Sequence, residues 1–296
     1  MKRTDFIISG GDMRMVYAAE RLSARHSAAL YGFDGADTRL RDITGDTDPG
    51  AFAADCAVLP IFAGSREIKY PLSGRDELLP WRELLTRYLK PGGIVFAGRV
   101  FPELEGFCAE KGFALYDYLS REELEILNAV PTAEGALAAA IRETDAAVHG
   151  ANVLITGFGR IGKLTARYFS ALGADVACAA RKKRDLAWVT ALGYRAVSFS
   201  DETELRAALG NADILINTAP AVILTAERAA CLRGNTVLIE LATSDCFTDS
   251  SVLPAGVKLV TARGLPGKVA PVTAGHIIAD TIENILTERS NENGGA

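Results

Sequence analysis

Residues 154–163 read LITGFGRIGK, an apolar run that leads directly into Gly157-Phe158-Gly159-Arg160-Ile161-Gly162 and then into a helical pattern. The first glycine of such a segment permits a tight turn, the second lets the backbone approach a pyrophosphate, and the third lets the helix pack on the strand. Unpaired N–H groups at the helix N-terminus bind the anion. Strand, glycines and helix in this order predict a dinucleotide-binding domain, with Gly157, Phe158, Gly159, Arg160, Ile161 and Gly162 at the cofactor.

The second strand of this domain indicates which dinucleotide is bound. It covers residues 176–180, and an enzyme that uses NAD would place an acidic residue near its end to hold the ribose hydroxyls. Here the chain continues with Arg181 and Lys182. A guanidinium suits the 2′-phosphate of NADP because it makes planar, two-pronged contacts. The alternative is a solvated basic start to the next helix, but NADP(H) is favoured over NAD(H).

Composition limits the class of protein. The chain has 296 residues, of which 49% are hydrophobic and 23% charged, enough for two domains with separate cores. A net charge of −5 gives no electrostatic case for nucleic acid as a partner. The five cysteines lie far apart without metal-ligand spacing, so we expect reduced core residues and no metal site. No signal peptide or membrane-spanning run is recognisable, and a cytoplasmic protein that does not bind membranes is expected.

The N-terminal part predicts an α/β domain over residues 1–130. Five short apolar runs have the length of buried parallel strands: residues 6–9, 28–31, 57–60, 94–97 and 113–116. Helical patterns lie between them, one with a stripe from Trp81 to Leu89 and one over residues 103–112. This alternation predicts a five-stranded, doubly wound domain of flavodoxin-like or Rossmann-like type.

The rest of the chain predicts a connecting helix and a second domain. Residues 131–150 contain an alanine-rich helix for which Thr132 is the expected N-cap, closed by His149 and Gly150. Residues 151–272 contain six strand candidates, as a Rossmann sheet requires: 153–155, 176–180, 195–197, 214–217, 236–239 and 258–260. Residues 273–296 are expected to form a C-terminal helix that frays into a disordered tail from Ser290.

Candidate ligand residues follow the ends of the strands, because ligands of open α/β sheets bind beyond the carboxyl ends. For the cofactor these are Thr218, Ala219, Pro220, Leu241 and Ala242; for the substrate they are Gly10, Gly11, Arg14, Ser65, Lys69, Arg263 and Lys268. His276, in the expected first turn of the last helix, is the candidate proton acceptor. Each of these residues could also have a purely structural role as a turn, an exposed cation or a helix contact.

The chain resembles the family of dipicolinate synthase A subunits over nearly its whole length. The resemblance rests on SGGDMR at residues 9–14, GFGRIG at 157–162, NTAP at 217–220 and LPGKVAPVTAG at 265–275. GFGRIG alone is shared with 2-hydroxyacid dehydrogenases. Those enzymes have Arg-Gly after the fifth strand, where this chain has Glu240-Leu241-Ala242-Thr243, so hydroxy-acid oxidation through their catalytic triad is not expected.

The resemblance implies a function that the residues alone do not. Members of this family oxidise dihydrodipicolinate, or its hydrated precursor, to dipicolinate with NADP+, together with a flavoprotein-like B subunit, in the mother cell of a sporulating bacterium. We therefore expect a small dicarboxylate substrate, a partnership with the B subunit, and an oligomer. Two alternatives stay open: another NADP-dependent dehydrogenase of similar architecture, and a non-catalytic subunit that only binds dinucleotide.

Overall fold

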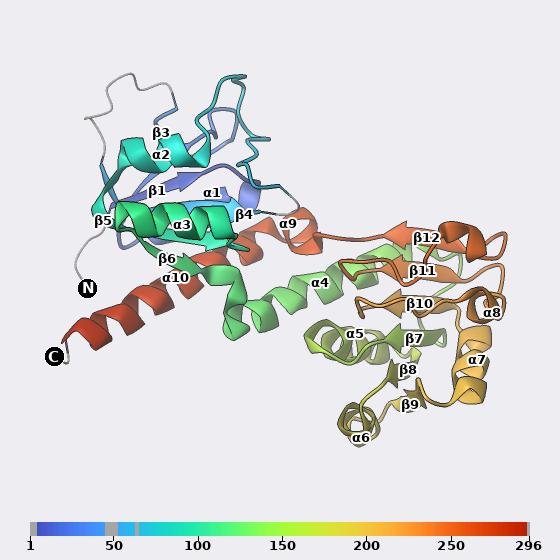
Figure 1. The fold of residues 1–296 in the computed structure, drawn as a ribbon. Coiled ribbons are helices and arrows are strands. Elements are labelled where there is room, and N and C mark those ends of the chain that lie inside the picture. The colour runs from blue at the N-terminus through green and yellow to red at the C-terminus, as the bar shows by residue number, and fades with distance from the viewer. Residues whose placement is uncertain (1–4, 45–52, 63–64, 295–296) are drawn as a thin grey trace. The chain divides into compact units, whose positions relative to one another are not determined.

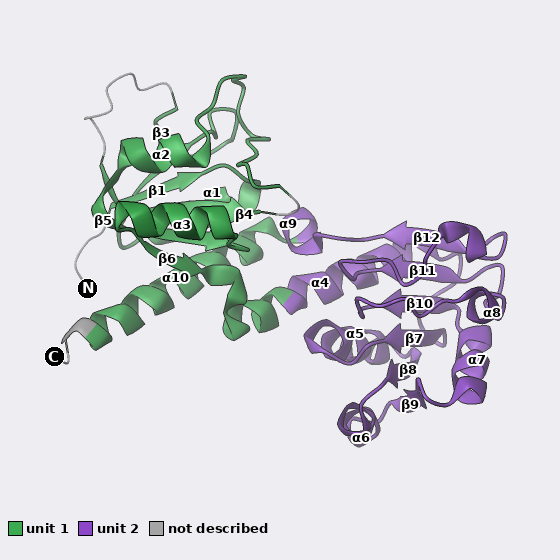
Figure 2. Ribbon diagram, in the orientation of Figure 1, with its two compact units in different colours: residues 1–128, 270–296 green, residues 129–269 purple. Residues whose placement is uncertain are grey.

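The chain folds into two compact α/β units, as the computed structural model shows for residues 5–44, 53–62 and 65–294 (Figures 1 and 2). Unit 1 comprises Met1–Asn128 and Ala270–Ala296, and unit 2 comprises Ala129–Val269. Each unit contains one parallel sheet with helices interleaved between its strands. The predicted fold class is confirmed.

The sheet of unit 1 has six parallel strands in the order β3-β2-β1-β4-β5-β6. Their bounds are β1 (Asp5–Ser9), β2 (Ser27–Tyr31), β3 (Arg41–Asp42), β4 (Ala54–Ile61), β5 (Leu89–Gly98) and β6 (Ala114–Asp117). The sequence predicted five of these, and the count of five was wrong because β3 is only two polar residues long. Its pairing with β2 completes the 3-2-1-4-5-6 order of a Rossmann sheet, whereas the other five strands alone have the flavodoxin order.

Alternating strand residues build two hydrophobic layers in unit 1. Phe6, Ile8 and Val58 face α1 (Met13–Ser23) and α10 (Pro271–Gly294), whereas Ile7 and Leu59 face the opposite side of the sheet. That side is covered by α2 (Trp81–Tyr88) and α3 (Pro102–Lys111). Side chains alternate between the faces of a strand, so apolar residues at every position predict burial on both faces.

The sheet of unit 2 has the order β12-β11-β10-β7-β8-β9, which is the Rossmann order read from its other edge. The strands are β7 (Asn152–Thr156), β8 (Asp175–Ala180), β9 (Arg195–Ser198), β10 (Ile214–Asn217), β11 (Val237–Glu240) and β12 (Lys258–Thr261). The helices are α5 (Arg160–Ala171), α6 (Lys183–Ala191), α7 (Glu202–Asn211), α8 (Ala226–Ala229) and α9 (Leu265–Val269). All six predicted strands are confirmed.

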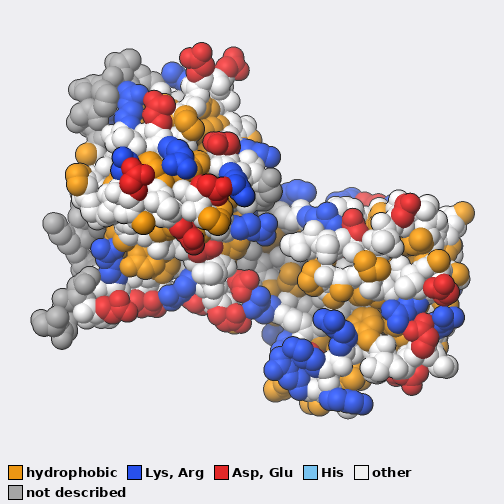
Figure 3. Space-filling view, viewed as in Figure 1, with side chains coloured by type: hydrophobic (Ala, Val, Ile, Leu, Met, Phe, Trp, Pro, Cys, Tyr) orange, Lys and Arg blue, Asp and Glu red, His pale blue; other side chains and the backbone are white. Residues whose placement is uncertain are grey.

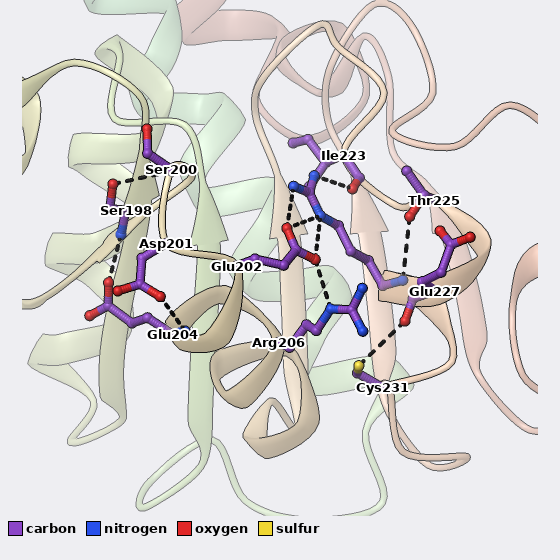
Figure 4. A network of polar contacts seen from close by, with 11 residues as sticks. Ser198, Ser200, Asp201, Glu202, Glu204, Arg206, Ile223, Thr225, Glu227 and Cys231 are labelled. Atoms are coloured by element: carbon purple, nitrogen blue, oxygen red, sulfur yellow. Dashed lines mark hydrogen bonds and ion pairs between the residues drawn. The ribbon is translucent and has the colours of Figure 1, made fainter.

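A surface network ties two helices of unit 2 together (Figure 4). Glu202 of α7 accepts hydrogen bonds from Arg206 of the same helix and from Arg228 of α8, at 2.7 Å and 2.8 Å. Arg228 also donates to the carbonyl oxygen of Ile223 at 3.1 Å. The two guanidinium groups lower the pKa of Glu202 to about 2, Arg228 contributing most. Asp201 caps α7 by accepting the N–H of Glu204 at 2.9 Å.

The helix expected to begin at Thr132 is longer at its N-terminal end. It is α4 (Glu122–Glu143), and it contains Pro131 in its interior. Thr132 is therefore not its N-cap, and residues 144–150 lie beyond its end. Leu124 packs in the core of unit 1 and Ala136 packs in the core of unit 2. This packing outweighs the preference of proline for the first turn of a helix.

By length and composition alone α4 would pass as a membrane span. Core helices of soluble proteins pass the same test, and 44% of the apolar window of α4 is buried.

The last helix differs from the prediction at both ends. It begins at Pro271, which places His276 beyond the first turn, and it extends to Gly294 where a disordered tail was expected from Ser290. Its buried stripe, which includes Ile278, Ile282 and Ile285, packs against α1 within unit 1. Gly275 permits this contact, since a Cβ there would overlap the carbonyl oxygen of Arg14. The buried stripe ends at Leu286, and the helix continues from there with mostly exposed side chains up to Glu292.

Candidate functional site

The glycine turn in unit 2 has the conformation that its sequence predicts. Gly157 has a φ of +97°, which favours glycine, and a Cβ there would lie about 2.5 Å from Thr218 Oγ1. A Cβ at Gly162 would overlap the carbonyl oxygen of Gly157, so the third glycine allows α5 to pack on the turn. At Gly159, the residue before α5, a Cβ would meet no atom within 4 Å. The open space lies where a phosphate group would approach the helix N-terminus.

A basic hollow of about 500 Å³ opens beside this turn. It is lined by Phe158, Gly159, Arg160, Ile161, Lys163, Lys182, Arg184, Asp185 and Thr218. Figure 3 shows Lys and Arg side chains gathered on the part of unit 2 that carries α5 and α6. The Lys163 ammonium lies 5.9 Å from the ring centres of both Phe158 and Trp188. The surroundings of the turn therefore favour a ligand with several negative charges.

The structure refines which charged residues adjoin the turn. Lys182 and Arg184 line the hollow, whereas Arg181 is exposed at the end of β8 and is not part of the lining. Sequence reasoning missed Lys163 and Asp185; the first lies one turn into α5, and the second lies in the first turn of α6. Asp185 forms an ion pair of 3.3 Å with Arg184. The hollow is nevertheless basic, because four cationic residues line it (Arg160, Lys163, Lys182 and Arg184) and Asp185 is the one carboxylate among its lining residues.

A buried polar network shapes the loops that follow β10 and β11. Asn217 and Glu240 are both fully buried. Asn217 donates to Glu240 Oε1 at 2.6 Å and accepts the N–H of Ala219 at 3.2 Å, while Thr156 donates to its Oδ1 at 2.7 Å. Glu240 also accepts the N–H groups of Ala242 at 3.1 Å and Cys246 at 2.8 Å. The predicted cofactor residues Thr218 to Pro220, Leu241 and Ala242 thus lie on loops held by side chains at strand ends.

The loop after β12 is partly helical. Arg263 donates to the carbonyl oxygen of Ala242 at 2.9 Å and to Asp245 at 2.6 Å, so its guanidinium braces the loop after β11. Residues expected in an open loop instead form α9, whose last turn carries the exposed Lys268. Of the two cations predicted for a substrate, Arg263 is engaged within unit 2 and Lys268 is on its surface.

In unit 1, the crevice beyond β1 is filled by the chain itself. Gly10 and Gly11 have φ values of +66° and +85°, and a Cβ at Gly10 would overlap the side chain of Ile68. The N–H of Gly11 donates to the carbonyl oxygen of Lys69 at 2.8 Å. Tyr70 covers Gly32 at the end of β2 and donates to the carbonyl oxygen of Leu79 at 2.7 Å. The segment from Ile68 to Tyr70 therefore takes the space that a dinucleotide would need at a Rossmann turn.

A small hollow of about 180 Å³ remains beside this segment. Gly11, Asp12, Arg14, Met15, Pro60, Ile61, Lys69, Pro71 and Ile278 line it. Asp12 Oδ1 and Oδ2 accept from Nε and Nη2 of Arg14 at 2.8 Å and 2.9 Å. Burial alone would lower the pKa of Arg14, but the hydrogen bond and charge of Asp12 outweigh it and raise that pKa above its ordinary value. The structure thus brings together Gly11, Arg14 and Lys69 from the predicted substrate set.

Among the predicted residues of unit 1, Gly10, Ser65 and His276 do not line that hollow. Ser65 donates to the carbonyl oxygen of Glu67 and does not line it. His276 lines a separate surface hollow of about 620 Å³, together with Glu20, Arg21 and Asp280. Among the described residues no group of three or more His, Cys, Asp or Glu could hold a metal ion. The four cysteines at positions 56, 108, 178 and 246 are buried, Cys231 is half-buried, and all five are free.

Comparison with known proteins gives consistent results for both units. Residues 5–119 match the family model of the N-terminal domain of the dipicolinate synthase A subunit, and residues 125–250 match that of the D-isomer specific 2-hydroxyacid dehydrogenase, NAD binding domain. The dipicolinate synthase A subunit of Bacillus subtilis strain 168 is 32% identical over 292 residues, covering 97% of both sequences. The chain belongs to the dipicolinate synthase A subunit family.

Solved structures agree with this assignment. The dipicolinate synthase A subunit from Bacillus halodurans superimposes with a TM-score of 0.82 at 31% identity, covering 96% of this chain and 97% of that one. An L-alanine dehydrogenase shares the fold, with a TM-score of 0.67 at 15% identity and coverage of 97% and 90%. As a member of the dipicolinate synthase A subunit family with a dehydrogenase-type domain, the chain is an oxidoreductase that binds a dinucleotide cofactor.

Proposed function

We propose that this protein is the catalytic subunit of a dipicolinate synthase, which oxidises dihydrodipicolinate or its hydrated precursor to dipicolinate with NADP+. The observation that carries the proposal is the family relationship over 97% of the chain, together with a glycine turn open to a phosphate. Aromatisation favours loss of hydride from a dihydropyridine, so the protein has to align the reactants and bind charge. When bound, NADP+ supplies the hydride acceptor.

The choice of NADP+ rests on the basic residues after β8. Lys182 and Arg184 line the hollow beside the glycine turn, and Arg181 lies next to them in the chain. Together with Lys163 they would hold a 2′-phosphate, while Gly157 to Gly162 would hold the pyrophosphate. Thr218, Ala219, Pro220, Leu241 and Ala242 would contact the riboses. NAD remains the second candidate because Asp185 also lines the hollow and could accept from a ribose hydroxyl.

The substrate is proposed to bind unit 1. Arg14 and Lys69 line a hollow whose size suits part of a small dicarboxylate. Lys268, exposed on α9 of unit 2, is proposed independently as a cation for a substrate carboxylate. As the family implies, we propose that the partner is a B subunit, that the working form is an oligomer, and that the protein works in the cytoplasm of a sporulating mother cell.

One experiment tests the proposed function directly. NADPH formation is followed at 340 nm with freshly generated dihydrodipicolinate, with and without the B subunit, and with NAD+ in place of NADP+. Turnover that requires the dihydropyridine and prefers NADP+ supports the proposal. Turnover of hydroxy or amino acids instead would indicate another dehydrogenase, and tight NADP(H) binding without hydride transfer in either form would indicate a non-catalytic subunit.

A further inference from the structure

The small hollow of unit 1 contains one carboxylate, that of Asp12, beside the cations proposed to bind the substrate. Asp12 is the residue before α1, with an extended backbone, and its Oδ1 also accepts the N–H of Arg14 at 3.1 Å. Its side chain remains 43% exposed. Among the described lining residues, Asp12 alone can accept a proton while Arg14 and Lys69 stay charged.

We propose that Asp12 is the proton acceptor of the reaction, an assignment that rests on the proposed function above. Oδ1 receives two hydrogen bonds, from the backbone N–H and Nε of Arg14, whereas Oδ2 receives one, from Nη2. Oδ2 therefore keeps more free acceptor capacity than Oδ1. The guanidinium fixes the orientation of the carboxylate, as a general base requires.

Three other groups that could accept a proton, those of His276, Tyr118 and Tyr70, make contacts away from Asp12. His276 lines the separate hollow with Glu20 and Arg21. The hydroxyl of Tyr118 is buried and donates to the carbonyl oxygen of Leu59 at 3.0 Å, and that of Tyr70 donates to Leu79. Burial raises the pKa of both phenols, so neither readily becomes a phenolate.

The reaction balances with a single base. One C–H bond of the dihydropyridine breaks, and its hydrogen leaves with both bonding electrons to NADP+. A second ring hydrogen then leaves as a proton to Asp12 Oδ2, and its bonding pair stays in the ring and completes the aromatic sextet. The products are the pyridine dicarboxylate, NADPH and one proton, which Asp12 passes to water. A carboxylate is a sufficient base because aromatisation drives the proton loss.

Asp12→Asn separates the proposed role of Asp12 as proton acceptor from its structural role as the N-cap of α1. Asparagine is as good an N-cap as aspartate, so α1 should persist, yet the amide cannot take the proton. We expect kcat to fall by about 100-fold or more, with a much smaller change in the substrate KM and unchanged NADPH binding. Asp201→Asn is the matched control, since the Asp201 side chain also caps a helix, α7 of unit 2, and it should retain wild-type kcat.

Chemical rescue provides a readout that a structural role would not give. Asp12→Ser keeps an N-cap side chain and leaves room for a small anion, so added formate should restore part of kcat in this variant and should leave the kcat of Asp201→Asn unchanged. A wild-type kcat in Asp12→Asn, or a loss confined to KM without rescue by formate, would overturn the assignment. Absence of turnover in the wild-type enzyme would instead contradict the proposed function, so the two failures are distinguishable.

Discussion

Asn217 at the end of β10 donates a hydrogen bond of 2.6 Å to the buried carboxylate of Glu240 at the end of β11. The pair joins the carboxyl ends of two neighbouring strands at the edge where the cofactor is expected. Glu240 also accepts two backbone N–H groups of the following loop, from Ala242 and Cys246. Both oxygens are thus occupied by donors, which stabilises a carboxylate away from water.

Glu240→Gln should destabilise the protein. One oxygen of Glu240 accepts from Asn217 and Ala242 and the other from Cys246, so the new amide NH2 would face a donor in either orientation. A buried donor left without an acceptor costs about 1–3 kcal/mol, which a urea titration would measure as a lower midpoint. The exposed Glu134→Gln serves as the control and should leave the midpoint unchanged. A wild-type midpoint in Glu240→Gln would show that water or rearrangement replaces these contacts.

Gly159→Val should fold normally and lose the cofactor. A Cβ at this position meets no protein atom and the backbone is extended, so the side chain is accommodated until a pyrophosphate needs its space. We expect an unchanged melting temperature and NADPH binding weakened more than tenfold, about 1.4 kcal/mol. Gly162→Ala is the contrasting variant: its Cβ overlaps the carbonyl oxygen of Gly157, so it should lower the melting temperature as well. Normal NADPH affinity in folded Gly159→Val would show that the turn is only structural.

Removing single cations after β8 should change cofactor choice. Arg181→Ala should weaken NADPH binding by about 1.5–3 kcal/mol, as expected for a hydrogen bond to a charged group, with little effect on NADH. Lys182→Ala and Arg184→Ala should act in the same direction, and since these two residues line the hollow, calorimetry on all three variants will rank them. Lys111→Ala, an exposed cation of unit 1, is the control. Equal losses for NADPH and NADH would remove the 2′-phosphate assignment.

Arg14→Ala and Lys268→Ala should each raise the substrate KM or lower kcat/KM without changing NADPH affinity. Both are proposed to contact substrate carboxylates, and neither belongs to the glycine turn or to the basic residues after β8. Steady-state kinetics with NADPH titrations would separate the two effects. If both variants retain wild-type kinetics, neither residue binds a substrate carboxylate, and Ser65, Arg66 and Lys69 become the next residues to test.

Acid should weaken the Glu202 network of Figure 4 in a defined pH range. The pKa of Glu202 is lowered from 4.5 to about 2 in the folded protein, chiefly by Arg228 and Arg206. Its stabilising contribution is therefore complete above pH 4.5 and is lost as pH falls toward 2. Urea midpoints of wild type and Glu202→Gln should differ at about pH 6 and converge near pH 2. A constant difference across this range would contradict the pKa assignment.

Local patterns in the sequence were sufficient for the Rossmann domain. The strands of unit 2 are apolar runs buried on both faces, and the glycine turn depends on steric demands that only a few neighbouring residues create. The same holds for the five longer strands of unit 1. Asp12 was not among the predicted site residues, and nothing in the sequence indicated that its side chain pairs with that of Arg14.

Tertiary structure alone decided the remaining features, because they depend on contacts between distant residues. β3 exists through pairing with β2, α4 continues through Pro131 because Leu124 and Ala136 pack in two cores, and α10 is ordered by α1. Likewise, Ile68 to Tyr70 fill the crevice at Gly10 and place Lys69 beside Arg14 and Asp12, which are distant from it in the chain. Sequence periodicity reports which face of an element is apolar, whereas the partner that covers it is chosen by the packing of the whole chain.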